Sequence, residues 1–268
     1  MSENTDTRHP FDGERFDRAR RIRFWDDIAY DYEGRIMQGD IPLQIVDYLQ
    51  NNGYIDNDTD GIEFGCGPGT YSTVLAPVLR ELVCVDTSEK MLNILSHRCD
   101  ELGIDNIRMI KQDFDEMIPD RRYDLSIATL CPGSGSQEAL KRMSDFAEKV
   151  CVHVMWIENT WDNLHAKVWE KLGKNYSFEE RKRTIVPDNL KAMGYEPDVL
   201  EFNGEVHWEL PVDELMSREK RTFYIYDQNI DPESELREVL CDYIDGDRFS
   251  IDCTNSMRVV IWDPESGS

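Results

Sequence analysis

Short apolar runs alternate with amphipathic stretches through the first 157 residues. The stretches between the runs repeat apolar residues every three to four positions, which predicts helices. The runs are apolar almost throughout, which is typical of parallel strands buried on both faces. Strands that alternate with helices favour a parallel, doubly wound α/β sheet with right-handed crossovers. The five predicted strands lie at residues 62–64, 81–86, 107–110, 123–130 and 151–157.

Both ends of the chain depart from this rhythm. Residues 1–14 show no periodicity, whereas an apolar stripe of Trp25, Ile28, Ala29 and Tyr32 predicts a helix. Beyond residue 157 we expect a polar helix at 161–180, a helix capped by Asp188, a strand at 199–210, a helix opening at Asp231-Pro232, and strands at 249–253 and 257–262.

The composition points to an acidic protein of a reducing compartment. The net charge of −24 opposes binding to nucleic-acid phosphates or anionic lipid, so we expect neither nucleic acid nor membrane as a partner. The acidity fits either solubility, for example in a salt-rich cytoplasm, or attraction to a cationic substrate or basic partner. The chain has no apolar run of about 18 residues and no apolar segment of a signal peptide. Seven scattered cysteines, with Cys84 and Cys241 expected in the core, favour a cytoplasmic location.

A glycine-rich turn is the main chemical signal. Residues 61–70 read Gly-Ile-Glu-Phe-Gly-Cys-Gly-Pro-Gly-Thr, which predicts a strand end, a tight turn and a helix start. Gly65, Gly67 and Gly69 remove Cβ atoms where the backbone turns sharply or approaches a ligand. The helix that follows directs its amide-rich N-terminus at the same crevice. The G-x-G-x-G spacing differs from the dinucleotide-binding pattern G-x-G-x-x-G.

Three further signals follow this turn at the ends of later strands. They are Asp86 after the second strand, Asp113-Phe114 after the third, and Leu130-Cys131-Pro132 after the fourth. Together with the turn they resemble class I S-adenosylmethionine-dependent methyltransferases, clearly over residues 25–157. Residues 63–70 look like the first motif of that family, with Glu63 where Asp is commoner, and residues 86–92 look like its second motif.

The resemblance implies a Rossmann-like α/β fold. We expect a doubly wound, mostly parallel seven-stranded sheet with helices on both faces, an N-terminal helical cover and a lid insertion after strand five. Four aromatic residues in the polar lid need something to cover, either the pocket mouth or a permanent packing surface; they are Trp161, Trp169, Tyr176 and Phe178. We expect one methyltransferase domain over 1–268, made of the cover (1–55), a cofactor-binding core (56–157), an acceptor lid (158–195) and C-terminal strands (196–268).

The resemblance also implies a cofactor, S-adenosylmethionine, with S-adenosylhomocysteine as its product. Asp86 would accept hydrogen bonds from the ribose hydroxyls, Asp113 would accept one from the adenine amino group, and Phe114 or Met91 would cover the adenine ring. Glu63 would steady the loop and the amino end of the cofactor. The implied cofactor-binding residues are Tyr30, Glu63, Gly65, Cys66, Gly67, Asp86, Thr87, Met91, Asp113, Phe114 and Leu130.

The expected function is direct in-line methyl transfer to a small molecule or a protein side chain, by a monomer or homodimer. A sulfonium is already a good leaving centre, so alignment and water exclusion suffice and we assign no catalytic residue. We expect His153 in the core, and His165 and His207 are only weak candidates for a base. The chain lacks C-x-x-C and H-E-x-x-H, so no metal site is expected. It also lacks Asn-Pro-Pro-Tyr, which argues against DNA adenine or glutamine-amide methylation.

Two alternatives stay open. The first is an NAD(P)-dependent oxidoreductase on a Rossmann-like sheet, against which the glycine spacing and the lack of a Tyr-x-x-x-Lys motif argue. The second is a non-catalytic cofactor-binding scaffold, against which the presence of Asp86, Asp113 and all three glycines argues. Oxygen, nitrogen, sulfur and carbon acceptors remain equally open, because a fold does not select among them.

Overall fold

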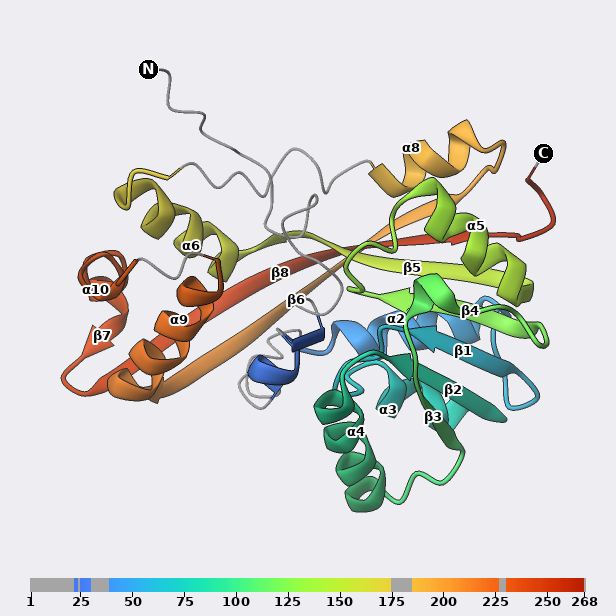
Figure 1. Ribbon diagram of the computed structural model, residues 1–268, viewed down its shortest axis with the longest axis horizontal. Helices are drawn as coiled ribbons and strands as arrows, with labels where there is room; N and C mark the ends of the chain where they lie inside the picture. The colour runs from blue at the N-terminus through green and yellow to red at the C-terminus, as the bar shows by residue number, and fades with distance from the viewer. Residues whose placement is uncertain (1–21, 24, 30–38, 175–184, 227–229, 268) are drawn as a thin grey trace.

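The computed structural model describes residues 22–23, 25–29, 39–174, 185–226 and 230–267. Its strands are β1 (Asp60–Phe64), β2 (Glu81–Asp86), β3 (Ile107–Lys111), β4 (Tyr123–Thr129), β5 (Ala147–Asn159), β6 (Asp198–Pro211), β7 (Ile244–Asp245) and β8 (Arg248–Trp262). They form one sheet in the order β3-β2-β1-β4-β5-β8-β6, and β7 pairs with β8 (Figure 1). The sheet therefore has eight strands, one more than the seven that the resemblance implied, and the two-residue strand β7 is the one that the sequence did not predict.

The helices alternate with the strands. They are α2 (Ile41–Asn51), α3 (Ser72–Leu75), α4 (Glu89–Leu102), α5 (Gln137–Phe146), α6 (Thr160–Lys171), α8 (Ile185–Ala192), α9 (Val212–Tyr226) and α10 (Glu233–Leu240), with short 3-10 turns η1 (Ala76–Val78), η2 (Phe114–Glu116) and η3 (Cys241–Tyr243). Residues 22–23 and 25–29 are also helical. No helix in these described parts of the chain has both the length and the apolar character needed to cross a membrane.

The first five strands form the predicted parallel half of the sheet. β1 pairs with β2 on one side and with β4 on the other, and β3 and β5 extend the sheet in parallel at its two sides. The chain thus winds first one way from β1 and then the other, which confirms the doubly wound Rossmann-like fold. In such a sheet the loops after β1 and β4 diverge and leave a crevice at the carboxyl ends of the strands.

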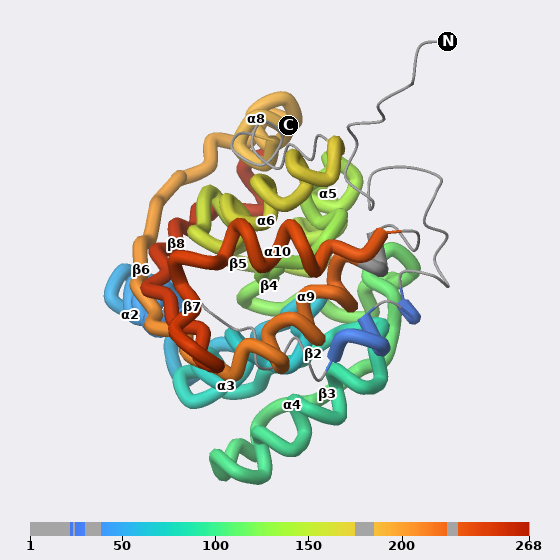
Figure 2. Tube along the Cα trace, turned by 90° about the vertical axis from the view of Figure 1, so that its left-hand side faces the viewer, coloured from blue at the N-terminus to red at the C-terminus, as the bar shows by residue number. Residues whose placement is uncertain are grey.

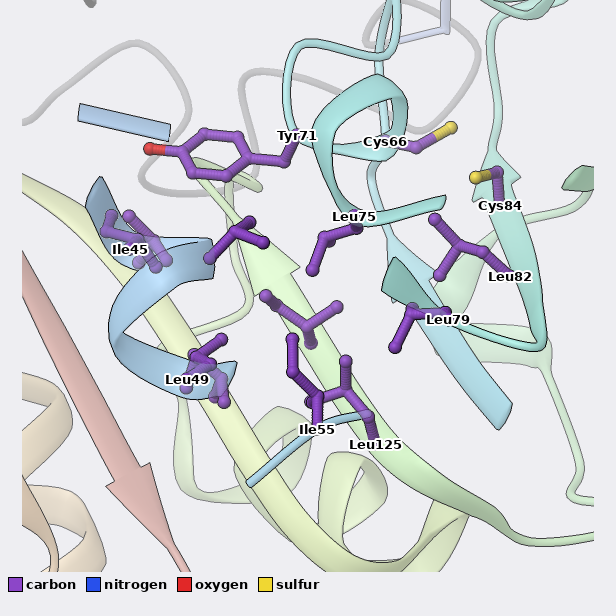
Figure 3. Packing of buried hydrophobic residues seen from close by; sticks show 14 of the residues in the cluster. Ile45, Leu49, Ile55, Cys66, Tyr71, Leu75, Leu79, Leu82, Cys84 and Leu125 are labelled. Carbon is purple, nitrogen blue, oxygen red and sulfur yellow. The ribbon is translucent and has the colours of Figure 1, made fainter. Parts of the chain in front are cut away.

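Helices cover both faces of the sheet, as expected. On one face, Ile45 and Leu49 of α2 pack with Tyr71 and Leu75 and with Leu125 of β4 (Figure 3). Side chains of α5 and α8 cover the other face. Burying each large aliphatic side chain stabilises the fold by roughly 1.5–3 kcal/mol, so the two helical layers hold the sheet whose strands end at the crevice.

The last part of the sheet differs from the prediction. β8 is one continuous strand of 15 residues, where two strands at 249–253 and 257–262 were expected. It pairs with β6 without a break from Arg248↔Pro211 to Ile261↔Asp198. The two-strand prediction failed because Asn255 interrupts the apolar alternation, although it is buried on the same face as Cys253 and Met257.

The far ends of β6 and β8 carry a second hydrophobic core. Figures 1 and 2 show α6, α9 and α10 gathered there, beyond the parallel strands. Trp161 and Trp169 of α6 are buried in this core, so they cover it rather than the pocket mouth. Tyr176 and Phe178 of the expected lid lie outside the described residues. Cys241, expected in the core, is exposed.

Candidate active site

A pocket opens at the carboxyl ends of the parallel strands, between the loops that follow β1 and β4. Nine of the eleven residues predicted to bind the cofactor line it: Gly65, Cys66, Gly67, Asp86, Thr87, Met91, Asp113, Phe114 and Leu130. Glu63 lies behind the pocket wall, and Tyr30 falls outside the described residues. Trp25, which the sequence placed in the apolar stripe of a predicted helix, also lines the pocket.

The glycine turn after β1 contains two kinds of glycine. Gly65 has φ of 66°, and a Cβ there would lie 2.4 Å from Cys131 Sγ. Gly67 has φ of 54°, but a Cβ there would meet nothing within 4 Å. Gly65 is therefore required by packing between the two loops. Gly67 borders open space in the pocket. The absence of a side chain there lets a ligand approach the backbone closely.

The carboxylate of Asp86 is held by backbone amides at the pocket edge. The Gly67 N–H donates to Oδ2 and the Ser88 N–H donates to Oδ1, each at 2.8 Å. Burial raises the pKa of Asp86, and these backbone bonds oppose that rise. Each oxygen keeps a second lone pair, so a pair of neighbouring hydroxyls can still bind the oriented carboxylate.

The end of β3 places an acid and an aromatic ring in the same wall. Asp113 accepts a hydrogen bond from the Asp115 N–H at 2.9 Å and so caps η2. The Phe114 ring packs against Phe64, with their centroids 4.4 Å apart, and the guanidinium carbon of Arg142 lies 5.8 Å from the Phe114 centroid. Phe64 and Arg142 therefore hold the Phe114 ring in place. A ring with a fixed orientation can stack on a flat ligand ring.

Glu63 occupies a different place from the one predicted. Its carboxylate is fully buried and accepts hydrogen bonds from Ser72 Oγ at 2.5 Å and Thr129 Oγ1 at 2.7 Å. Burial raises the pKa of Glu63 to about 7. Because β1 directs this side chain into the interior, Glu63 reaches the pocket only through Thr129, which does line it. Its direct contact with a cofactor is therefore not supported by the geometry, whereas its steadying of the loop is.

The loop after β4 has a strained start. Leu130 has φ of 52°, and among the described residues it is the one non-glycine with a positive φ. Such a conformation costs of order 1–3 kcal/mol and is found most often at functional sites. The Leu130 N–H donates to the Val154 carbonyl at 2.9 Å, which ties the strained residue to β5. Burial raises the pKa of the neighbouring Cys131 thiol to about 12, so this thiol is not a thiolate nucleophile at neutral pH.

A buried hydrogen-bond chain that the sequence did not reveal supports this loop. Ser134 Oγ donates to the Cys131 carbonyl at 2.6 Å and lies 2.8 Å from His153 Nε2. Because the Ser134 proton is used by the carbonyl, Nε2 of His153 carries the ring proton and donates to Ser134. Burial lowers the pKa of His153 to about 4, so the ring is neutral at neutral pH. His153 is thus a core residue, as predicted, with an additional structural task.

His165 and His207 lie away from the pocket. His165 Nε2 is 2.6 Å from the buried Glu219 carboxylate in the second core, and His207 Nδ1 is 2.8 Å from Asp252 on the exposed side of β6. Neither lines the pocket. Sequence reasoning also missed several lining residues, although Thr70 and Tyr71 directly follow the glycine motif and could have been included on that ground.

Comparisons with known proteins agree with this geometry. Residues 62–151 match the methyltransferase domain family. A tRNA/tmRNA (uracil-C(5))-methyltransferase from Pseudomonas entomophila (strain L48) is 31% identical over 62 residues, which are 23% of this chain and 17% of that protein. The chain therefore spans less than a fifth of the length of that curated relative.

Solved structures share the fold at low sequence identity. The magnesium protoporphyrin IX methyltransferase ChlM from Synechocystis PCC 6803, with bound SAH, has a TM-score of 0.55 and 14% identity, over 91% of this chain and 99% of its own. A proposed methyltransferase from Bacillus halodurans C-125 has a TM-score of 0.52 and 12% identity, over 82% and 98%. Residues 62–151 thus match a methyltransferase domain family, and the described chain shares the fold of these solved structures.

Proposed function

We propose that this protein transfers the methyl group of S-adenosylmethionine to an acceptor by direct in-line displacement. The observation that carries the proposal is the amide-held Asp86 carboxylate beside the bare Gly67 backbone, at the crevice of a methyltransferase domain. S-adenosylmethionine would supply a methyl group on a positively charged sulfur, and transfer would form the bond from acceptor to methyl carbon while the carbon–sulfur bond breaks and leaves its electron pair on sulfur.

The residues of the pocket fit the parts of this cofactor. Asp86 binds the ribose hydroxyls through the free lone pairs of its carboxylate, and Asp113 accepts from the adenine amino group while Phe114 and Met91 cover the ring. Gly65 and Gly67 admit the methionine portion. The three acidic side chains that line the pocket, Asp86, Asp113 and Asp115, favour a ligand that carries positive charge.

The chain's part in the reaction is to align and to exclude water. The strained Leu130 and the loop after it also line the pocket, and we infer that the acceptor enters beside them. The Cys131 thiol, which lines the pocket, stays protonated, and the buried His153 ring stays neutral, so neither adds a competing nucleophile or a charge there. Alignment of an acceptor with an activated methyl group accounts for catalysis without an acid–base pair.

The acceptor, the location and the assembly are part of the proposal. We infer a small molecule or a protein side chain as acceptor, since the charge of −24 disfavours nucleic acid. We infer a monomer or homodimer in the cytoplasm. The whole chain would act as one methyltransferase domain, in which α6 packs in the second core. The NAD(P)-dependent oxidoreductase is not favoured, because the family match and the glycine spacing both oppose it.

One experiment tests the activity and narrows the acceptor. The protein is incubated with methyl-labelled S-adenosylmethionine and size-fractionated extract, and calorimetry compares S-adenosylhomocysteine with NAD. We expect micromolar or tighter binding of S-adenosylhomocysteine and label on one size class. Binding of NAD without binding of S-adenosylhomocysteine would contradict the proposal, and cofactor binding without any transfer would favour the non-catalytic scaffold.

A further inference from the structure

We propose that Asp26 is a positioning residue of the cofactor pocket, which fixes the N-terminal helical residues to the start of α4 and thereby holds Trp25 in the pocket wall. The proposal rests on the proposed function for the identity of the ligand. It assigns to an N-terminal carboxylate a role in cofactor affinity although that carboxylate does not line the pocket.

The first support is the contact that Asp26 makes with α4. Asp26 Oδ1 accepts a hydrogen bond from Ser88 Oγ at 2.6 Å and a longer one from the Lys90 N–H at 3.4 Å. Ser88 is the N-cap of α4, and its Oγ also accepts from the Met91 N–H at 3.2 Å. A carboxylate at this position is favoured by the positive end of the 14-residue helix and by the charge-assisted bond from the hydroxyl.

The second support is the link from Ser88 to the ribose carboxylate. The Ser88 N–H donates to Asp86 Oδ1 at 2.8 Å, while its hydroxyl donates to Asp26. One residue therefore connects Asp26 with the carboxylate proposed to hold the ribose. Any shift of the N-cap that follows loss of Asp26 is transmitted to Asp86 through a single residue.

The third support is apolar packing beside this hydrogen bond. Ala29, Met91 and Ile94 are 0%, 1% and 5% exposed and form a small buried cluster, against which Trp25 packs. Trp25 and Met91 also line the pocket. Apolar contact alone allows a short helix to slide or rotate, since it has no direction. The Asp26–Ser88 bond supplies the direction, because Asp26 is adjacent to Trp25 in the chain.

The neighbouring acid provides a matched control. Asp27 is 59% exposed, and within the described residues its ion pair is with Arg23, which is 84% exposed, at 3.6 Å. An Asp27→Ala change removes the same charge one residue away, at a pair that contributes little. Ser88→Gly also removes the Asp26–Ser88 bond. Glycine keeps the backbone N–H that donates to Asp86 and is tolerated at an N-cap.

The test is calorimetric titration of the full chain with S-adenosylhomocysteine. We expect Asp26→Ala to weaken binding about tenfold, which is the scale of one charge-assisted hydrogen bond. Asp26→Asn retains an oxygen that accepts from Ser88 and should stay within about threefold of wild type, whereas Asp27→Ala should be unchanged. The effect of the double variant Asp26→Ala with Ser88→Gly on affinity should be smaller than the sum of the two single effects, because both changes remove the Asp26–Ser88 bond.

A spectroscopic readout separates positioning from simple stability. Tryptophan fluorescence is followed during the same titration, and Trp25→Phe assigns the part of the signal that comes from Trp25. We expect Asp26→Ala to lose the fluorescence change that comes from Trp25, while its thermal midpoint without ligand stays at the wild-type value. Equal affinity of Asp26→Ala and wild type, or equal weakening by Asp27→Ala, would overturn the proposal. If the wild-type protein itself does not bind S-adenosylhomocysteine, the proposed function fails instead.

Discussion

His153 Nε2 donates a hydrogen bond to Ser134 Oγ across 2.8 Å, and both side chains are buried. This contact joins the middle of β5 to the loop that forms one wall of the pocket. Because both groups are buried, a polar group that loses its partner here costs more than the bond itself contributes.

We therefore expect an asymmetry between substitutions of this pair. Ser134→Ala leaves the His153 N–H buried without a partner and should lower the free energy of unfolding by about 1–3 kcal/mol. The double variant Ser134→Ala with His153→Leu removes both polar groups and should be more stable than Ser134→Ala alone. Urea unfolding measures all three proteins, and a double variant less stable than Ser134→Ala would show that the ring matters only by its packing.

Glu63 should give the protein a distinct pH dependence. Its pKa of about 7 in the folded protein exceeds the ordinary value of 4.5, so the folded state binds more protons between these values. The stability from this group is full below about pH 4.5 and is lost as the pH rises through about 7, by about 3 kcal/mol. Glu63→Gln does not titrate, so its stability relative to wild type should increase from pH 5 to pH 8.

The test has to compare the stability of Glu63→Gln with that of the wild type at each pH, because the pKa shift of His153 changes the wild-type stability in the opposite direction. Its folded pKa of about 4 is below the ordinary 6.5, so its contribution is full above 6.5 and falls as the pH falls through 4. The two slopes partly cancel in the wild-type protein. A Glu63→Gln profile parallel to wild type over pH 5–8 would contradict the raised pKa of Glu63.

Gly67 should matter for the ligand more than for the fold. Gly67→Val places a branched side chain in the open space of the pocket and should abolish binding of S-adenosylhomocysteine by calorimetry. Gly103→Val is the matched control, because Gly103 also has positive φ and free space around it but ends α4 far along the chain. Both variants should lose similar stability from backbone strain. Normal binding by Gly67→Val would make the turn purely structural.

Asp86 should contribute strongly to cofactor affinity. Asp86→Ala is expected to weaken binding of S-adenosylhomocysteine by about 1.5–3 kcal/mol, the range for hydrogen bonds to a charged group. The fold should persist, because Asp86 ends β2 rather than filling the core. Asp105→Ala removes an exposed acid and serves as the control. An unchanged dissociation constant for Asp86→Ala would remove this residue from the ribose role.

Hydrogen exchange should distinguish the two segments once expected to close over the cofactor. Trp161 and Trp169 anchor α6 in the second core, so we expect equal protection of α6 amides with and without S-adenosylhomocysteine. Residues 25–29 should gain protection on binding, because Trp25 lines the pocket. Protection of α6 that appears only with ligand would restore it as a mobile lid.

The sequence revealed the parallel half of the fold and most of the pocket because both are encoded locally. Buried parallel strands are continuous apolar runs, and the glycine turn, Asp86 and Asp113 each follow one directly. The Ser134–His153 pair could not be read in this way, because it joins two elements through the fold. The helix α9 was missed although Val212, Leu215 and Met216 have helical spacing. The continuity of β8 was hidden by one buried polar residue.

The single register of β8 limits how this protein can change. Phe249, Ile251 and Cys253 face the second core, and Met257 and Val259 on the same side of the strand face the sheet's main core. One inserted residue between these groups would turn one set outward, since side chains alternate across a strand. Insertions are therefore tolerated better in the loops than within β8. Because one strand sets the register of both cores, a chimera joined within β8 would have to keep the register of both.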